Sequence, residues 1–500
     1  MGSLLTLFLA IPLACVALAT ILPWRWARDG LALLTPLGTA LAGVWLFAYT
    51  AAHGILGHSV GLYIGEVAIT FVADRLSAIM IVVASIVTFA SNWFAIVAGE
   101  TLSRFYSALS LMLLSGVMGG LLTADLFNFF VFIEVMLLPS YGLMAMTGTW
   151  ARLSAGRTFV LVNLATSTLL LIGVCIVYGV SGTVNIALLR GTAAGNGPMV
   201  VAMGIVVIAL VIKAGLFPVH TWLPRSYPAT SASVMGLFSG LHTKVAVYML
   251  LRIYVIIFDL SARWIWLITA VCVASMLVGS FAGLGENSMR RVLAYQMVGG
   301  MPFIVITFAF SAGTDNAIMV LAAGIFYAIH HMVTVGSLIL TAGALEETYG
   351  TDLLSRLSGI AKRDPWVAAV FAAGSLSVIG FPPFSGLWGK VGVVLGVAGA
   401  HNEQAWFVLA VIAVASFGAF LAMLRLWRTV FWGAEMNRER IPHNLHVPAR
   451  RLAPGATLIV VSFLMFCAAG FVVDSTQGAA RDLLNTKDYA QAVLSQEGAH

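Results

Sequence analysis

Long apolar runs fill this chain, and only short polar stretches separate them. By hydropathy we predict about 14 membrane-spanning helices, because about 20 apolar residues cross the core of a bilayer. These segments are residues 3–22, 31–52, 76–98, 104–122, 126–147, 157–180, 198–222, 230–256, 263–284, 291–312, 317–342, 366–394, 404–432 and 454–473. The longest polar stretches are 343–365, 434–453 and the tail 475–500. The pattern predicts an all-α, polytopic membrane protein without a separate soluble domain.

Composition supports this class of protein. Of the 500 residues, 60% are hydrophobic and only 9% are charged, whereas a soluble domain carries about 25% charged residues. The net charge of +6 comes from arginines in short loops, so membrane topology explains it and we expect no nucleic-acid partner. The four cysteines are isolated in apolar segments. Their spacing predicts neither a metal site nor a disulfide framework, and we expect no cofactor.

The distribution of basic residues predicts the orientation in the membrane. Most of the 26 Lys and Arg residues fall in odd-numbered loops, which the positive-inside rule assigns to the cytoplasm. The loops at 148–157, 343–365 and 434–453 are therefore predicted to be cytoplasmic. With an even number of helices, both termini are predicted to be extracytoplasmic. The run 3–22 lacks a basic region before it, so we interpret it as a spanning helix rather than a signal peptide.

Four charged residues lie inside predicted membrane segments, namely Glu134, Lys213, Lys244 and Lys390. Each costs at least about 2.5–3.5 kcal/mol near the bilayer centre, so a functional role is the first hypothesis. The alternative for a lysine is snorkelling to the interface, which suits Arg252 at a helix end and stays open for Lys390. The alternative for Glu134 is a structural hydrogen bond between helices.

Two predicted membrane segments contain helix breakers. One runs from Lys213 through Phe217-Pro218 to Pro224, and the other from Gly380 through Pro382-Pro383 to Lys390. Proline removes a backbone hydrogen bond and clashes with the preceding turn. Paired broken segments in a transporter indicate an inverted repeat and the position of its ion site. The two breaks are separated by about five helices, although the lysine precedes the proline in one and follows it in the other.

Four stretches together resemble a known family: 125–141, 213–224, 241–248 and 380–390. The chain is similar, over about residues 70–430, to the antiporter-like subunits shared by Mrp-type cation/proton antiporters and the proton-pumping membrane arm of respiratory complex I. The residues around Glu134 are most similar to D subunits of Mrp antiporters.

This resemblance implies a fold of 14 helices in two inverted five-helix repeats, with broken seventh and twelfth helices. It divides the chain into N-terminal helices 1–3 (1–98), a first repeat (104–256), a second repeat (263–432), and a last helix with a short tail (454–500).

The resemblance also implies a function, namely a proton-translocating subunit of a secondary antiporter and not an enzyme. Its partners would be other membrane subunits, protons and a monovalent cation, with Na⁺ favoured, in the lipid bilayer of a bacterial plasma membrane. The chain alone would show no antiport. The alternative is a proton-pumping subunit of complex I or of a membrane-bound hydrogenase.

The family's functional residues map onto this sequence as a buried Glu134–Lys213 pair, a central Lys244, His330 and His331, and an exit-side Lys390. Burial disfavours the charged form of a lysine and a nearby carboxylate favours it, so movement of Glu134 would switch proton release. Histidine suits the intermediate steps, since its charge changes near working pH.

The sequence departs from the family at one place. Many members carry lysine four residues after the second histidine, and this chain has Val335. His330 instead shares a helical face with Thr334, Ser337 and Thr341. We hypothesise that these hydroxyls carry the path, the alternative being that they only bond to neighbouring helices. His220, in the first break, is a further candidate that would line the path.

Overall fold

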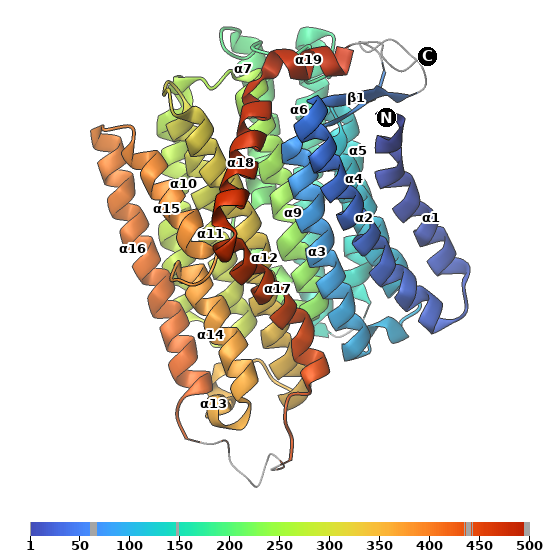
Figure 1. The fold of residues 1–500 in the computed structure, drawn as a ribbon, viewed down its shortest axis with the longest axis vertical. Helices are drawn as coiled ribbons and strands as arrows, with labels where there is room; N and C mark the ends of the chain where they lie inside the picture. The colour runs from blue at the N-terminus through green and yellow to red at the C-terminus, as the bar shows by residue number, and fades with distance from the viewer. Residues whose placement is uncertain are drawn as a thin grey trace.

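The structure is a computed structural model that describes residues 2–60, 68–146, 150–434, 436, 442 and 444–494. Roughly parallel and antiparallel helices form one bundle (Figure 1). The helices of the first half are α1 (Leu7–Ile21), α2 (Arg25–His53), α3 (Arg75–Ala98), α4 (Tyr106–Leu122), α5 (Leu126–Ala145), α6 (Trp150–Ser181), α7 (Gly197–Ala214), α8 (Trp222–Ser226) and α9 (Ala232–Arg252). Those of the second half are α10 (Ile265–Ala282), α11 (Met289–Ser311), α12 (Ala317–Tyr349), α13 (Ile360–Arg363), α14 (Pro365–Ile379), α15 (Gly386–Ala398), α16 (Glu403–Leu426), α17 (Ala449–Cys467), α18 (Ala469–Leu484) and α19 (Thr486–Leu494).

The predicted all-α membrane fold is confirmed. Within the described residues, 12 helices are long and apolar enough to cross a membrane. The two other predicted spans correspond to α4, which is shorter, and to the pair α14 and α15. Length and composition therefore do not by themselves confirm a count of about 14. Part of the loop 434–453, including Arg440, lies outside the described residues.

Both predicted breaks are present. Helix α7 stops at Ala214 because Gly215 adopts a left-handed conformation (φ +74°), and α14 stops before Gly380 (φ +100°). Glycine takes this conformation without steric cost. The next long helices after the two broken segments, α9 and α16, both end in a π-helical turn, at Ile253–Ile257 and Trp427–Phe431. These parallels agree with two related halves, while the boundaries 104–256 and 263–432 stay a prediction.

The C-terminal segment is more structured than a polar tail. Helix α18 continues from α17 after a bend at Ala468, and the two cross the outside of the bundle from one end to the other (Figure 1). Helix α19 then turns over a small hairpin formed by β1 (Leu56–Ser59) and β2 (Thr70–Ala73), which pair antiparallel with Leu56 opposite Ala73. It buries Tyr489 and Val493. The segment thus seals the end of the bundle where α3 begins.

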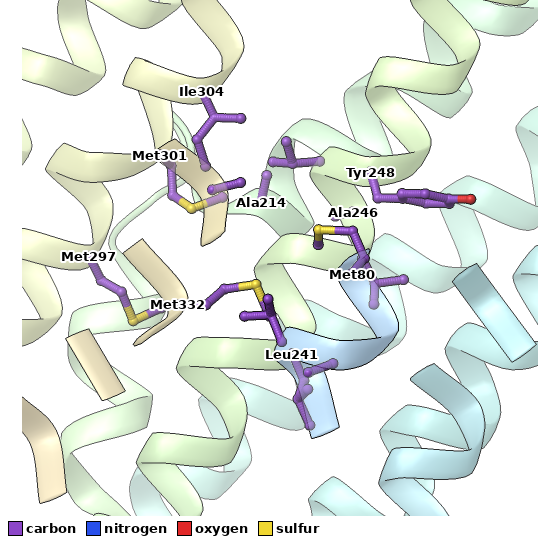
Figure 2. Packing of buried hydrophobic residues seen from close by; sticks show 14 of the residues in the cluster. Met80, Ala214, Leu241, Ala246, Tyr248, Met297, Met301, Ile304 and Met332 are labelled. Atoms are coloured by element: carbon purple, nitrogen blue, oxygen red, sulfur yellow. The ribbon is translucent and has the colours of Figure 1, made fainter. Parts of the chain in front are cut away.

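The centre of the bundle is formed by α9, α11 and α12, whose residues are almost all buried. Methionines from three helices gather around α9: Met80 of α3, Met297 and Met301 of α11, and Met332 of α12 (Figure 2). Flexible thioether side chains fill irregular space well. The charged residues of the centre are therefore embedded in a tightly filled apolar core.

Candidate ion-translocation site

Glu134 and Lys213 are both bound to α6, which lies between them. Glu134 of α5 accepts a hydrogen bond from the Ser167 hydroxyl, and Lys213 donates to the Asn163 amide oxygen at 3.1 Å. Asn163 and Ser167 lie one turn apart on the same face of α6. The two charges interact electrostatically, although no direct ion pair joins these two described residues. Each member of the predicted pair is thus held by a polar side chain of α6.

These contacts bear on both interpretations of Glu134. Its bond to α6 is the helix–helix hydrogen bond that a structural role requires, and its electrostatic interaction with Lys213 is what a switch requires. Lys213 lies in the last turn of α7, directly before Gly215. The unpaired carbonyls at the end of a helix favour a positive charge there. The break therefore helps to hold a lysine inside the membrane.

His242 was missed as a candidate, although it lies in one of the four stretches that carry the resemblance. Its Nε2 is 2.8 Å from the Ser140 hydroxyl of α5, and its ring meets Phe238 edge-on. It interacts electrostatically with Lys213. It stands on α9 two residues before Lys244, so one helix carries both this histidine, which contacts α5, and the central lysine. The Leu-His-Thr-Lys pattern itself was the available signal.

Lys244 is wholly buried at the centre of the bundle. Its ammonium group donates to the Ser239 carbonyl at 2.9 Å. It lines a small cavity of about 20 Å³ together with Met80, Tyr248 and Thr307, enough for about one water molecule. His331 of α12 interacts with it electrostatically. These two predicted relay residues therefore lie on helices that pack against each other.

His331 occupies space that a glycine of α11 leaves free. A Cβ added at Gly300 would lie 2.1 Å from the Nε2 of His331. Only a residue without a side chain fits beside this ring. The ring position is therefore fixed by packing between α11 and α12.

His330 belongs to a network of hydroxyl groups at the second break. Its Nδ1 is 2.9 Å from the Ser385 hydroxyl and 3.2 Å from the Thr334 hydroxyl. Ser462 of α17 is 2.7 Å from Ser385 and 3.0 Å from Ser377, and Ser377 is 3.1 Å from Thr334. The network offers more hydrogen-bonding pairs than it has hydroxyl protons. Its donor directions are therefore free to change.

The predicted hydroxyl stripe divides after Thr334. Ser337 donates instead to the Gly455 carbonyl of α17 at 2.7 Å, and Thr341 donates to the Ser337 carbonyl. These are the bonds to neighbouring backbone that the structural alternative describes. Thr334 joins the network with His330, and Ser337 and Thr341 do not.

Lys390 follows the prolines of the second break in sequence, whereas Lys213 precedes the proline of the first, but the contacts of Lys390 remove this difference. It lies on α15, but its ammonium group reaches back to the carbonyl of Ile379, the last residue of α14, at 2.8 Å. It also donates to the Ser416 hydroxyl at 3.1 Å and lies 5.2 Å from the centre of the Phe303 ring. At each break, a lysine therefore places a positive charge near the C-terminal end of the helix that precedes the break. Lys390 interacts electrostatically with His330.

Two other residues lie away from these clusters. His220 is buried in the first break, where its ring stacks on Phe217. Arg252, interpreted from sequence as snorkelling, does not bring its guanidinium group to solvent: it is 1% exposed and forms an ion pair with Asp74 of 2.7 Å. That interpretation is wrong. The partner was missed because Asp74 stands just outside a predicted segment.

Comparison with known proteins shows the family of this chain. Residues 123–418 match the family described as NADH:quinone oxidoreductase/Mrp antiporter, transmembrane. The chain belongs to this family. The D subunit of the Na(+)/H(+) antiporter of Alkalihalophilus pseudofirmus is 30% identical over 92% of each chain. The D subunit of a probable K(+)/H(+) antiporter of Rhizobium meliloti is 30% identical over 85% of this chain and 84% of its own.

Solved structures extend the likeness to the fold. A chain of the Mrp complex from Dietzia sp. is 36% identical, covers 99% of both chains and superposes with a TM-score of 0.92. A chain of respiratory complex I from Thermus thermophilus has a TM-score of 0.79 over 97% of this chain at 24% identity, and shares the fold. The predicted resemblance to antiporter-like subunits is therefore confirmed, with D subunits of antiporters among the similar relatives.

Proposed function

We propose that this chain is the D-type, proton-translocating subunit of a multisubunit monovalent cation/proton antiporter in a bacterial plasma membrane. The observation that carries the proposal is a row of titratable groups across the bundle. Lys213, Lys244, His330 and His331 are buried, and Glu134 and Lys390 are half-buried. Intramembrane ionisable groups mark ion paths by default. Membership of this family supports ion transport as the activity of these groups.

The mechanism follows from competition for each lysine. Glu134 favours the protonated form of Lys213, and burial opposes it. If Glu134 moves away from Lys213 and toward Ser167, it favours the protonated form of Lys213 less. The proton of Lys213 would then pass toward His242, whose Nε2 bonds to Ser140. From Lys244 the charge would pass along α12 to the hydroxyl network and Lys390. Under this proposal, the other subunits of the antiporter are the partners of this chain.

The exchanged cation is proposed to be Na⁺, as for the Alkalihalophilus relative. The Rhizobium relative, named for K⁺, is equally similar in identity. A test of function therefore compares both ions in the same vesicles.

The experiment uses the complete complex in inverted membrane vesicles. Lys213→Ala and Glu134→Ala should each abolish cation-induced proton movement, measured with a fluorescent pH probe, while the chain remains in the membrane. Because coupled residues are non-additive, the double variant should be no worse than either single variant.

A matched control is Lys487→Ala, a lysine on the exposed side of α19. It should leave antiport unchanged. Normal antiport in Lys213→Ala would end the assignment of the first pair. Antiport retained with both Na⁺ and K⁺ absent would end the proposal of cation exchange.

A further inference from the structure

A second charged pair is buried in this bundle outside the row described above. Arg252, at the end of α9, and Asp74, the cap of α3, are 1% and 0% exposed and 2.7 Å apart. Asp74 also accepts from the backbone and hydroxyl of Ser77. A buried ion pair costs desolvation that its attraction often only offsets. Such a pair in a transporter therefore calls for a role.

The pair stands directly beyond the central lysine. Arg252 lies eight residues after Lys244 on α9, a rise of about 12 Å. Between them is Tyr248, which lines the same small cavity as Lys244. Helix α9 thus leads from the cavity to the end of the bundle covered by α18 and α19. A proton on Lys244 would otherwise have a short way out along this helix.

Tyr248 cannot pass a proton, because its hydroxyl is saturated. It donates its only proton to the Leu121 carbonyl at 2.7 Å and accepts from Nε and Nη2 of Arg252 at 3.0 and 2.8 Å. A hydroxyl has one donor and two acceptor positions. All three are occupied, in contrast to the rearrangeable network around His330.

Arg252 adds a permanent charge at the same point. A guanidinium group is not deprotonated in proteins, so it neither accepts a proton nor admits a hydronium ion beside it. Its outer side is covered by the Tyr489 ring of α19, whose centre is 5.2 Å from Cζ. Helix α18 is held in place by the bidentate pair of Asp482 with Arg75.

We propose that Tyr248, Arg252 and Asp74, covered by α19, form a proton seal that prevents leakage from Lys244 to this end of the molecule. The seal directs the charge sideways along α12, toward His331 and Lys390. The inference rests on the proposed function, since it assumes that Lys244 carries protons. It assigns the C-terminal helices a task that the transport row does not include.

The test measures passive proton entry into proteoliposomes that hold the whole complex, driven by a pH step with no gradient of Na⁺ or K⁺. The double variant Asp74→Asn/Arg252→Gln avoids an unpaired buried charge. Its proton leak should rise by about tenfold or more, because the variant removes the guanidinium and frees the acceptor positions of Tyr248, and a barrier lower by about 1.4 kcal/mol is a tenfold rate. Arg252→Lys should leak to an intermediate extent, because a buried lysine can lose its proton and lacks the forked donors that saturate Tyr248. Adding Lys244→Leu to the double variant should remove the leak.

The control is Arg290→Gln/Glu346→Gln, which neutralises an ion pair between α11 and α12 that lies outside the seal. It should leak no more than the unmodified complex. An assembled double variant that stays proton-tight would overturn the seal, as would a leak that persists without Lys244. Lys213→Ala tests the proposed function separately, since a leak-free complex without antiport would leave the seal intact.

Discussion

At the residue scale, the hydroxyl network around His330 leads to a prediction for the second half of the path. His330→Ala should abolish antiport, and Thr334→Val and Ser462→Ala should slow it, because each removes a member of the rearrangeable network. Ser337→Ala should leave the rate unchanged and cost about 0.5–1.5 kcal/mol of stability, the value of one hydrogen bond. The measurement is cation-induced proton movement in vesicles, normalised to the amount of this chain.

Ser337→Ala is the matched control, being a hydroxyl of the same helix bonded to backbone. Slowing by Ser337→Ala equal to that of Thr334→Val would contradict the division of the stripe. Loss of antiport in His331→Ala together with normal antiport in His330→Ala would place the path outside the network.

The charged groups of the path could be predicted from sequence, and most of their polar partners could not. Lysine and glutamate in apolar runs are conspicuous because of their cost. Asn163, Ser167 and Ser462 are ordinary helix residues in sequence, and only the packing of α6 and α17 brings them to the charged pair and the hydroxyl network. Helical spacing did connect His330 with Thr334. It could not show that Ser337 turns to another helix.

At the element scale, the breaks in the helices could be predicted from the sequence. The contact that Lys390 makes across the second break could not. Proline and glycine fixed where α7 and α14 end. The return of Lys390 to Ile379 depends on how α15 is angled after the break, which no local pattern encodes. The helical nature of α18 escaped prediction because Arg481 and Asp482 make it resemble a solvated tail, whereas Asp482 is paired with Arg75.

The contact between α14 and α15 gives a prediction for the second break. An added Cβ at Gly386 would lie 1.7 Å from the Ser377 carbonyl oxygen and 3.0 Å from His330. Gly386→Ala should therefore force the half-helices apart, destabilise the fold by about 1–3 kcal/mol as overpacking does, and reduce antiport. The measurement is the thermal midpoint of the detergent-solubilised complex together with its activity.

Gly204→Ala is the control, because its Cβ would meet nothing within 4 Å and alanine suits a helix interior. It should not lower the midpoint. Equal behaviour of the two variants would show that α15 shifts without cost and that the geometry of the break is not restrictive.

At the scale of the whole molecule, composition and loop charges predicted the class of protein, and the arrangement adds which parts meet. The end with α19 gathers the start of α3, the end of α9 and the hairpin (Figure 1). The opposite end carries α13, the end of α16 and the start of α17. Sequence could not predict the seal, because Asp74, Arg252 and Tyr489 are brought together by three distant segments.

The orientation of these two ends is the remaining prediction at this scale. Loop charges assign the α13 end to the cytoplasm and the α19 end to the outside. Lys362 on α13 and Asn402, the cap of α16, are exposed and lie at opposite ends of the bundle. In a chain whose four cysteines are replaced, Asn402→Cys should react with an impermeant maleimide added to intact cells. Lys362→Cys should react only after the membrane is opened. The reverse labelling would show the opposite topology. The seal would then lie between Lys244 and the cytoplasm, and it would prevent leakage to the cytoplasm rather than to the outside.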